Sequence, residues 1–168
     1  ADVQIPGSVA IDTNGDGRDD SFAGVTTNAG KAEIKGVELE AIANITPNFM
    51  LAGMVSYIDA KYKEYIVAGV NVADQRIFQN TPKNSANLRA NYDIPLPVMG
   101  HKGRVSLIGS WAYKGATKQF ETASLLDQDS YRIWDASIVW TRQDGKVRAG
   151  LHGKNLGDTH YKTAGYLF

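Results

Sequence analysis

The chain has 168 residues, enough for one domain with a sizeable core. It carries 18 Lys or Arg and 18 Asp or Glu residues, so the net charge is zero and nothing in the composition favours nucleic acid as a partner. No cysteine is present, which excludes a disulfide scaffold and a thiolate metal site. No stretch is apolar for the ~18 residues of a transmembrane helix, but a transmembrane strand needs only about 9–11 alternating residues.

Residues 1–20 are predicted to form a loop that contains the first half of a calcium-binding pattern. Asp12, Asn14 and Asp16 alternate, Gly17 supplies the turn, and Asp20 takes the ninth position of the pattern. The twelfth position, where such loops carry a bidentate Glu, is Ala23. Two interpretations stay open: a calcium-stabilised surface loop, and a polar, glycine-rich loop without an ion.

A series of alternating runs predicts β-strands from residue 22 onwards. Residues 22–27 form a short strand, 28–30 a turn, 33–45 a strand, 46–48 a tight turn, and 49–57 the return strand. In the strand 33–45, Val37 and Leu39 lie on an apolar face, whereas Glu38 and Glu40 lie on the other.

A long connection over 62–83, with room for a short hairpin of its own, precedes the cleanest strand, 86–94. In that strand Leu88 is apolar on one face, and Asn87, Arg89 and Asn91 are polar on the other. The next strand, 104–114, carries Trp111 on its apolar face, and a second long connection spans 115–130.

The run from Trp134 to Leu156 predicts a hairpin around Gln143-Asp144-Gly145-Lys146, because Asp-Gly between alternating runs is a strong hairpin signal. Its apolar face carries Ile138, Val147 and Leu151, and its polar face carries Arg148 and Lys154.

Short connections (46–48, 95–103, 143–146) therefore alternate with long ones (62–83, 115–130), and aromatic residues gather near strand ends. Both features are typical of an antiparallel transmembrane β-barrel, in which the apolar face meets lipid and the polar face lines the lumen. The expected lipid-facing residues are Val37, Leu39, Leu88, Trp111, Ile138, Val147 and Leu151. The expected lumen-facing residues are Glu38, Glu40, Asn87, Arg89, Asn91, Arg148 and Lys154.

Three segments resemble, in the same order, parts of the barrel of TonB-dependent outer-membrane receptors. They are residues 28–40, residues 78–83 leading into an alternating strand, and Gly153-Lys154-Asn155-Leu156-Gly157-Asp158 followed by Tyr161. The resemblance implies a large, plugged barrel of the 22-stranded class in the outer membrane of a Gram-negative bacterium. It also implies uptake of a scarce nutrient, such as an iron-siderophore, a vitamin or a glycan, with energy transmitted by TonB.

Against that family pattern, we expect the chain to supply seven or eight strands and to lack the N-terminal plug and the TonB-contacting segment. Residues 21–168 are then strands with short periplasmic turns and long extracellular loops, and residues 1–20 are an outer loop. The implied partners are outer-membrane lipid, TonB and the imported solute. No cofactor is required, and calcium is the one metal that the sequence suggests.

No arrangement of residues predicts an enzyme, because His101, His152 and His160 stand alone and no nucleophile or phosphate-loop motif is present. Two other interpretations remain. A self-contained eight-stranded membrane barrel requires residues 22–27 to pair with 161–168. A secreted, calcium-dependent, carbohydrate-binding β-sandwich requires the apolar faces to meet in a core.

Overall fold

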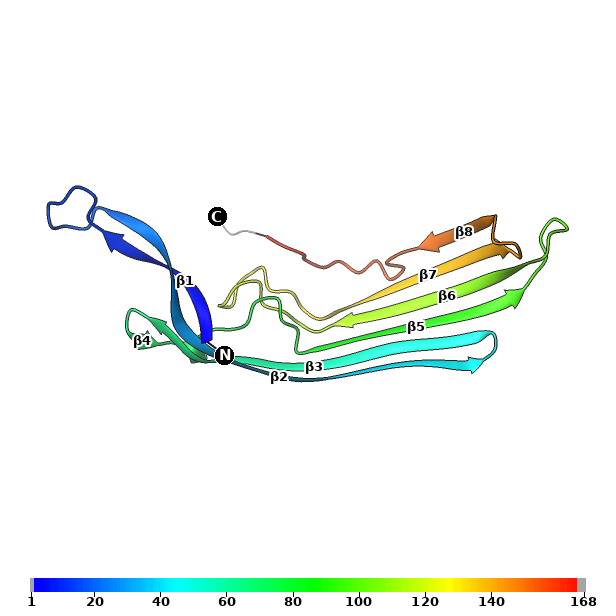
Figure 1. The fold of residues 1–168 in the computed structure, drawn as a ribbon, viewed down its shortest axis with the longest axis horizontal. Helices are drawn as coiled ribbons and strands as arrows, with labels where there is room; N and C mark the ends of the chain where they lie inside the picture. Colours follow the sequence, from blue (N-terminus) through cyan, green and yellow to red (C-terminus); the bar gives the residue numbers. More distant parts are fainter. Residues whose placement is uncertain (1, 166–168) are drawn as a thin grey trace.

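The computed structural model describes residues 2–165, and its long regular elements are all β-strands (Figure 1). The strands are β1 (Asp2–Ile11), β2 (Ser21–Thr46), β3 (Phe49–Val67), β4 (Val70–Asn71), β5 (Asn84–Pro95), β6 (Gly103–Lys114), β7 (Tyr131–Arg142) and β8 (Arg148–Gly153). One short 3₁₀-helix, η1 (Ala73–Gln75), follows β4. Within residues 2–165, no helix is long and apolar enough to cross a membrane.

The strands form one antiparallel sheet in the order β1-β2-β3-β5-β6-β7-β8, and β4 pairs only with the end of β3. Chain direction therefore alternates, so the loops 12–20, 68–83 and 115–130 lie at one end of the sheet and the turns 47–48, 96–102 and 143–147 at the other. This confirms the all-β antiparallel fold and the alternation of short and long connections. The small hairpin expected in the first long connection is formed by Val67 and Val70.

The prediction that residues 1–20 form a loop is wrong for the first half of that segment. Residues 2–11 form β1, which pairs with residues 21–31 of β2, and the loop itself spans 12–20. The alternation of Val3, Ile5, Val9 and Ile11 is interrupted by Pro6 and Gly7, which hides a strand in the sequence. Proline is tolerated in β1 because β1 lies at the edge of the described sheet.

The turn predicted at residues 28–30 is also absent, because β2 runs without a break from Ser21 to Thr46. Gly30 is buried and pairs with Val3 on one side and Tyr65 on the other, so it fills a ladder position and does not reverse the chain. β3 likewise continues ten residues past the predicted end at Tyr57, to Val67. Both strands therefore extend well beyond the predicted alternating segments, and β1 with the first part of β2 bends away from the other strands (Figure 1).

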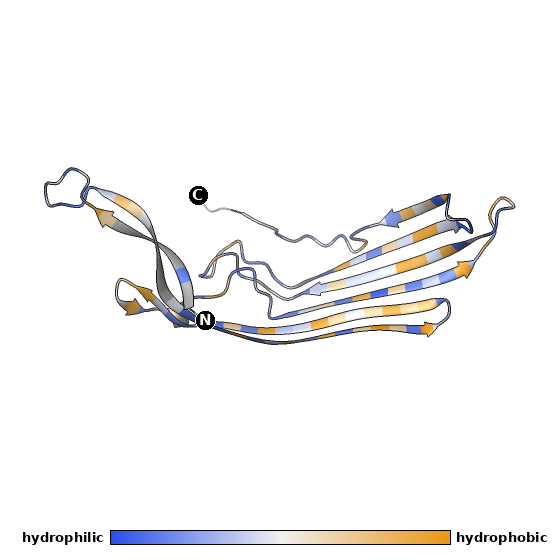
Figure 2. Cartoon of the chain, viewed as in Figure 1, coloured by the Kyte–Doolittle hydropathy of each residue, from blue (hydrophilic) through white to orange (hydrophobic). Residues whose placement is uncertain are grey.

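The sheet has no apolar core between layers in its described residues. Among the residues whose burial is described, only Tyr65, Ala73 and Val139 are buried hydrophobic side chains, whereas Leu39 is 66% and Leu151 78% exposed. Apolar and polar residues alternate along the strands (Figure 2). A two-sheet sandwich is therefore not formed by the described residues.

The pairing required for a self-contained eight-stranded barrel is also missing. Residues 22–27 pair with β1, and residues 161–165 belong to no strand. Residues 166–168, the rest of the expected partner, lie outside the described residues. Within the part of the chain that the structure describes, the sheet stays open at β8 and along residues 32–46 of β2, where β1 no longer runs beside it.

Candidate functional site

The strand register places the expected lumen residues on one common face. Glu38 stands opposite Ser56, which in turn stands opposite Ser85, and Arg89 stands opposite Ser110. Continuing these pairs across the sheet puts the following on one face: Glu38, Glu40, Asn87, Arg89, Asn91 and Arg148. Lys154 directly follows the last residue of β8 and so lies outside the ladder.

The expected lipid residues share the opposite face. Val37 pairs with Tyr57, Leu88 with Trp111, and Ile138 with Leu151. The register joins Val37, Leu39, Leu88, Trp111, Ile138 and Leu151 on this face. Val147 belongs to the turn before β8, where its carbonyl oxygen accepts a hydrogen bond from the Arg142 amide at 3.0 Å.

The polar face contains both paired and unpaired side chains. Asp93 accepts hydrogen bonds from Ser106 Oγ at 2.6 Å and from Asn91 Nδ2 at 3.2 Å, while Arg104 Nε lies 4.0 Å away. Four charged residues on the same face have no side-chain hydrogen bond or ion pair among the described residues: Glu38, Glu40, Arg89 and Arg148. Their charges are therefore free to contact groups outside the described residues.

At the long-loop end, residues 68–83 and 115–130 pack together into a unit that we call the loop platform. The backbone amides of Ile77 and Asn80 donate to the carbonyl oxygens of Glu121 and Lys118, both at 2.8 Å. Phe78 stacks on Tyr62 with ring centroids 4.3 Å apart. These contacts join three elements that are distant in sequence: β3 and the two long loops.

A charged and aromatic cluster lies at the centre of the loop platform. Tyr65 is only 5% exposed, and its hydroxyl donates to Glu121 Oε2 at 2.6 Å. The Arg76 guanidinium lies 5.2 Å from the centre of the Tyr65 ring, within cation–π range. Arg76 Nε is buried without a hydrogen-bond partner among the described residues. The half-buried guanidinium of Arg76 lies beside aromatic surfaces, and its terminal N–H groups suit an anionic group carried by an aromatic or apolar molecule.

Residues after β8 extend the loop platform. Lys162 Nζ donates to the carbonyl oxygens of Leu125 and Asp127 at 2.9 and 3.0 Å, and Tyr161 stacks on Tyr131 at 4.6 Å. The Asp127 carboxylate accepts from Lys118 Nζ at 2.7 Å, and this contact lowers the pKa of Asp127 below its usual range. Residues 154–165 therefore bind the loop 115–130 at several points.

Asn155, in the segment that carries the family resemblance, fixes the start of this extension. It adopts a positive φ of 49°. Its side-chain Oδ1 accepts a hydrogen bond from the Thr159 N–H at 3.0 Å, and its Nδ2 donates to the Thr159 carbonyl oxygen at 3.1 Å. Its backbone N–H donates to the Asp135 carboxylate. A side chain that closes a local ring in this way stabilises a left-handed residue outside a strand. Asn155 thus ends the β8 ladder and directs the chain across the loop platform.

Sequence reasoning missed the cluster of Tyr65, Arg76 and Glu121 altogether. Tyr65, near the end of β3, and Glu121, in the second long loop, are 56 positions apart, and no spacing rule connects a strand end to an irregular loop. The aromatic residues Tyr62, Tyr65 and Phe78 within the first long connection were the only signal present.

The four candidate calcium ligands form a closed loop at 12–20. The Asp12 carboxylate accepts the N–H groups of Asn14, Gly15 and Gly17 at 2.6–3.1 Å, and these bonds, Gly17 first, lower its pKa. Asp20 accepts from the Thr13 hydroxyl at 2.7 Å, which lowers the Asp20 pKa as well.

The remaining ligand candidates bond within the same loop: Asn14 Oδ1 accepts the Asp16 N–H, and Asp16 Oδ1 accepts the Arg18 N–H. In the part of the chain that the structure describes, no three acidic or histidine side chains are arranged to hold a metal. Calcium binding through Asp12, Asn14, Asp16 and Asp20 stays a prediction.

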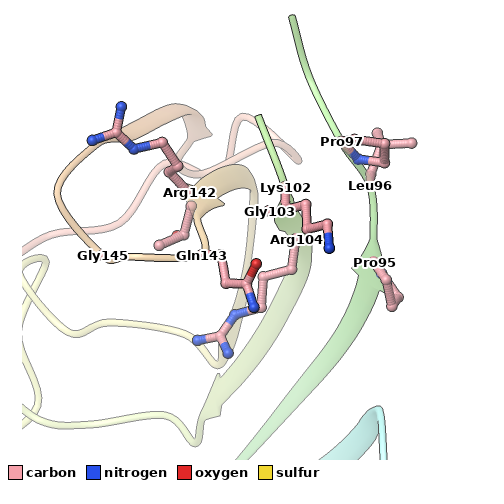
Figure 3. A pocket seen from close by; sticks show the side chains of 10 residues that line it. Pro95, Leu96, Pro97, Lys102, Gly103, Arg104, Arg142, Gln143 and Gly145 are labelled. Carbon is pink, nitrogen blue, oxygen red and sulfur yellow. The ribbon is translucent and has the colours of Figure 1, made fainter. Parts of the chain in front are cut away.

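A shallow hollow of about 530 Å³ lies at the short-turn end, between the turns 96–102 and 143–147. Its charged lining residues are Lys102, Arg104 and Arg142, and the guanidinium of Arg142 points away from that of Arg104 (Figure 3). Arg142 Nε donates to Asp144 at 2.8 Å, and this bond lowers the Asp144 pKa. Of these three cationic side chains, Arg142 is therefore bonded to Asp144 of the turn.

The model of the "TonB dependent receptor-like, beta-barrel" family matches residues 2–156. The chain belongs to this family of receptor barrels. No solved structure matches it. Receptors of this family are transporters of the Gram-negative outer membrane and not enzymes. The match covers every strand of the sheet, so the open sheet is part of a TonB-dependent receptor barrel.

Proposed function

We propose that the chain forms part of the wall of an outer-membrane transporter that takes up a scarce nutrient with energy supplied through TonB. The observation that carries this proposal is a single open sheet whose two faces differ in chemistry. An apolar face that is exposed in the described chain needs a covering, and lipid covers it in a membrane barrel. The family match supports the same interpretation.

The length of the apolar face fits a bilayer. On β2 it runs from Val37 to Ile45, on β3 from Phe49 to Tyr57, on β5 from Ala86 to Ile94, and on β6 from Val105 to Tyr113. Each segment is about nine residues long, close to what a tilted transmembrane strand needs. Aromatic residues stand near both ends, for example Phe49 against Tyr92 and Trp111 against Trp134. We call these segments the apolar band.

The proposed lipid-facing residues are those of the apolar band, together with Ile138 and Leu151. The proposed lumen face contains Glu38, Glu40, Asn87, Arg89, Asn91 and Arg148, where unpaired charges contact the plug or a hydrated solute. The long-loop end faces outward, so the loop platform forms part of the first binding surface for the nutrient. Half-buried Arg76, beside the Tyr65 ring, gives that surface a positive charge for an anion.

The test is uptake in a strain that lacks the receptor and is then given it back. Labelled ferric siderophore, vitamin and glycan are offered separately, with and without TonB. One of the three should enter only when both the receptor and TonB are present. Arg76→Gln should lower that uptake roughly tenfold, because the half-buried positive charge of the loop platform is lost.

Arg18→Gln is the matched control, because the Arg18 side chain is exposed and makes no hydrogen bond or ion pair within the described residues. It should leave uptake unchanged. If no class of nutrient depends on the receptor and TonB, the transport proposal fails. If Arg76→Gln and Arg18→Gln behave alike, the assignment of the loop platform fails.

A further inference from the structure

Three lysines gather around one carboxylate on the outer part of β2 and β3. Glu33 lies 2.5 Å from Lys35 Nζ, 3.0 Å from Lys63 Nζ and 3.8 Å from Lys61 Nζ. A second acid, Asp59, lies 3.4 Å from Lys61. We call Lys35, Lys61 and Lys63 the outer lysine cluster.

The register places this cluster on the same face as the apolar band. Lys35 pairs with Asp59 and Glu33 with Lys61, directly beyond the pair formed by Val37 and Tyr57. Lys35 stands two residues beyond Val37, ~7 Å along the strand, whereas Lys61 and Lys63 stand four and six residues beyond Tyr57, ~13 and ~20 Å along the strand. A bilayer is about 40–45 Å thick including its headgroups and ~30 Å thick in its hydrocarbon core, so each headgroup layer is roughly 5–8 Å deep. For strands tilted by about 45°, the distances along the bilayer normal are ~5, ~9 and ~14 Å for Lys35, Lys61 and Lys63. Lys35 therefore lies at headgroup height when the apolar band spans the hydrocarbon, and Lys61 and Lys63 lie at or beyond the outer border of that layer, with their ammonium groups 3.8 and 3.0 Å from Glu33.

The cluster is not neutralised by the protein. Three ammonium groups meet two carboxylates, which leaves an excess of one positive charge, and the adjacent Lys31–Glu64 pair at 3.1 Å is neutral. The lysine side chains remain 70%, 48% and 53% exposed for Lys35, Lys61 and Lys63. Each ammonium has three donors, so donors stay available after the contacts with Glu33 and Asp59.

We propose that the outer lysine cluster binds a phosphate group on the headgroup of a lipid in the leaflet around the long-loop end. This rests on the proposed assignment of the apolar band to lipid. A phosphate supplies the missing negative charge and several acceptor oxygens, and a lysine ammonium is a common phosphate donor. Continuity with the apolar band favours a lipid over a soluble anion, because the acyl chains of the lipid lie along Val37 and Tyr57.

The test uses the receptor as the cell produces it, reconstituted in phosphatidylcholine vesicles with diphosphoryl lipid A or with its dephosphorylated form. Retained lipid A is counted by native mass spectrometry. The triple variant K35Q/K61Q/K63Q should lose diphosphoryl lipid A by roughly tenfold or more, since each lysine near a charged surface contributes separately. The dephosphorylated lipid should bind weakly to both proteins.

Two further variants keep the test independent of folding. K102Q/K146Q removes two exposed lysines at the short-turn end and should leave lipid A retention unchanged. Glu33→Gln removes the acid that competes with phosphate and should increase retention. Equal retention by the triple variant and the native receptor would overturn the proposal, as would displacement of the lipid by inorganic phosphate at the same concentration.

Spin labels distinguish a failure of the lipid-binding proposal from a failure of the proposed function. A label on L88C should be accessible to oxygen dissolved in lipid, and one on N87C to a water-soluble nickel complex. If L88C is in lipid and the triple variant still retains lipid A, only the lysine proposal is wrong. If L88C is in water, the assignment of the two faces is wrong as well.

Discussion

At the scale of single residues, the turn between β5 and β6 contains a backbone conformation that its residue type does not favour. Val98 and His101 exchange backbone hydrogen bonds at 3.0 and 3.1 Å around Met99 (φ 50°) and Gly100 (φ 77°). Two positive φ values define a type I′ turn, in which Asn-Gly is preferred. Met99 is 93% exposed, so its side chain gains little from packing.

Met99→Asn should therefore stabilise this turn by about 1 kcal/mol, the approximate cost of a left-handed residue with an ordinary side chain. Hydrogen exchange at the amides of Val98 and His101 should slow about fivefold. Gly100→Ala is the opposite control: no atom lies within 4 Å of the added Cβ, so any acceleration of exchange reports backbone strain alone. Unchanged or faster exchange in Met99→Asn would show that the turn is not held in this conformation.

At the scale of elements, alternation predicted the strands best where one face must be apolar. Residues 86–94, 104–114 and the hairpin around Asp144 lie within observed strands or turns at or close to the predicted positions. The predictions failed where the strands pass beyond the apolar band. Beyond Tyr57, Asp59, Lys61 and Lys63 occupy the face that was apolar, and the period-2 signal in hydropathy is lost although pairing with β2 continues.

The loop platform shows a second limit of sequence reasoning at this scale. Its contacts join Tyr65 and Ile77 to Glu121, and neither length nor composition of a loop specifies such partners. The sequence indicated both long connections, although residues 62–67 of the first belong to β3, but not that the two pack on each other.

Glu121→Ala should loosen both long loops at once, because it removes the acceptor of the buried Tyr65 hydroxyl. Hydrogen exchange at the amides of Ile77 and Asn80, which bond across to the loop 115–130, should accelerate roughly tenfold. Asp129→Ala is the matched control: Asp129 lies in the same loop, is exposed, and its side chain has no partner in the described residues. Acceleration confined to the loop 115–130 would show that the loops move separately.

At the scale of the whole molecule, the sheet has two edges at membrane height, β8 and residues 37–45 of β2. β1 pairs with β2 only over residues 21–31, beyond the apolar band, so it does not cover the second edge. Six strands (β2, β3, β5, β6, β7 and β8) therefore supply the membrane-height part of the described sheet. The smallest transmembrane barrels have about eight strands, and open edges in lipid leave backbone groups unpaired at a cost of several kcal/mol each.

We therefore expect the edges of β2 and β8 to be paired in the membrane with other strands of the receptor barrel, and not with each other. The chain has no cysteine, so a disulfide within it can form only between engineered cysteines. Leu39, Ala41 and Ala43 are each changed to Cys together with Leu151→Cys, which samples three registers, and copper phenanthroline is added to the receptor in vesicles. No disulfide within the chain should form in any of the three.

S56C/S85C is the positive control, because the two hydroxyl oxygens lie 2.6 Å apart on neighbouring strands, and it should cross-link. A disulfide between β2 and β8 in the same chain would mean that six strands close on themselves. The lumen of such a small barrel is filled by its own side chains and leaves no room for a plug or a nutrient. That single result would contradict both the transport proposal and the interpretation of Glu38, Arg89 and Arg148 as lumen-lining charges.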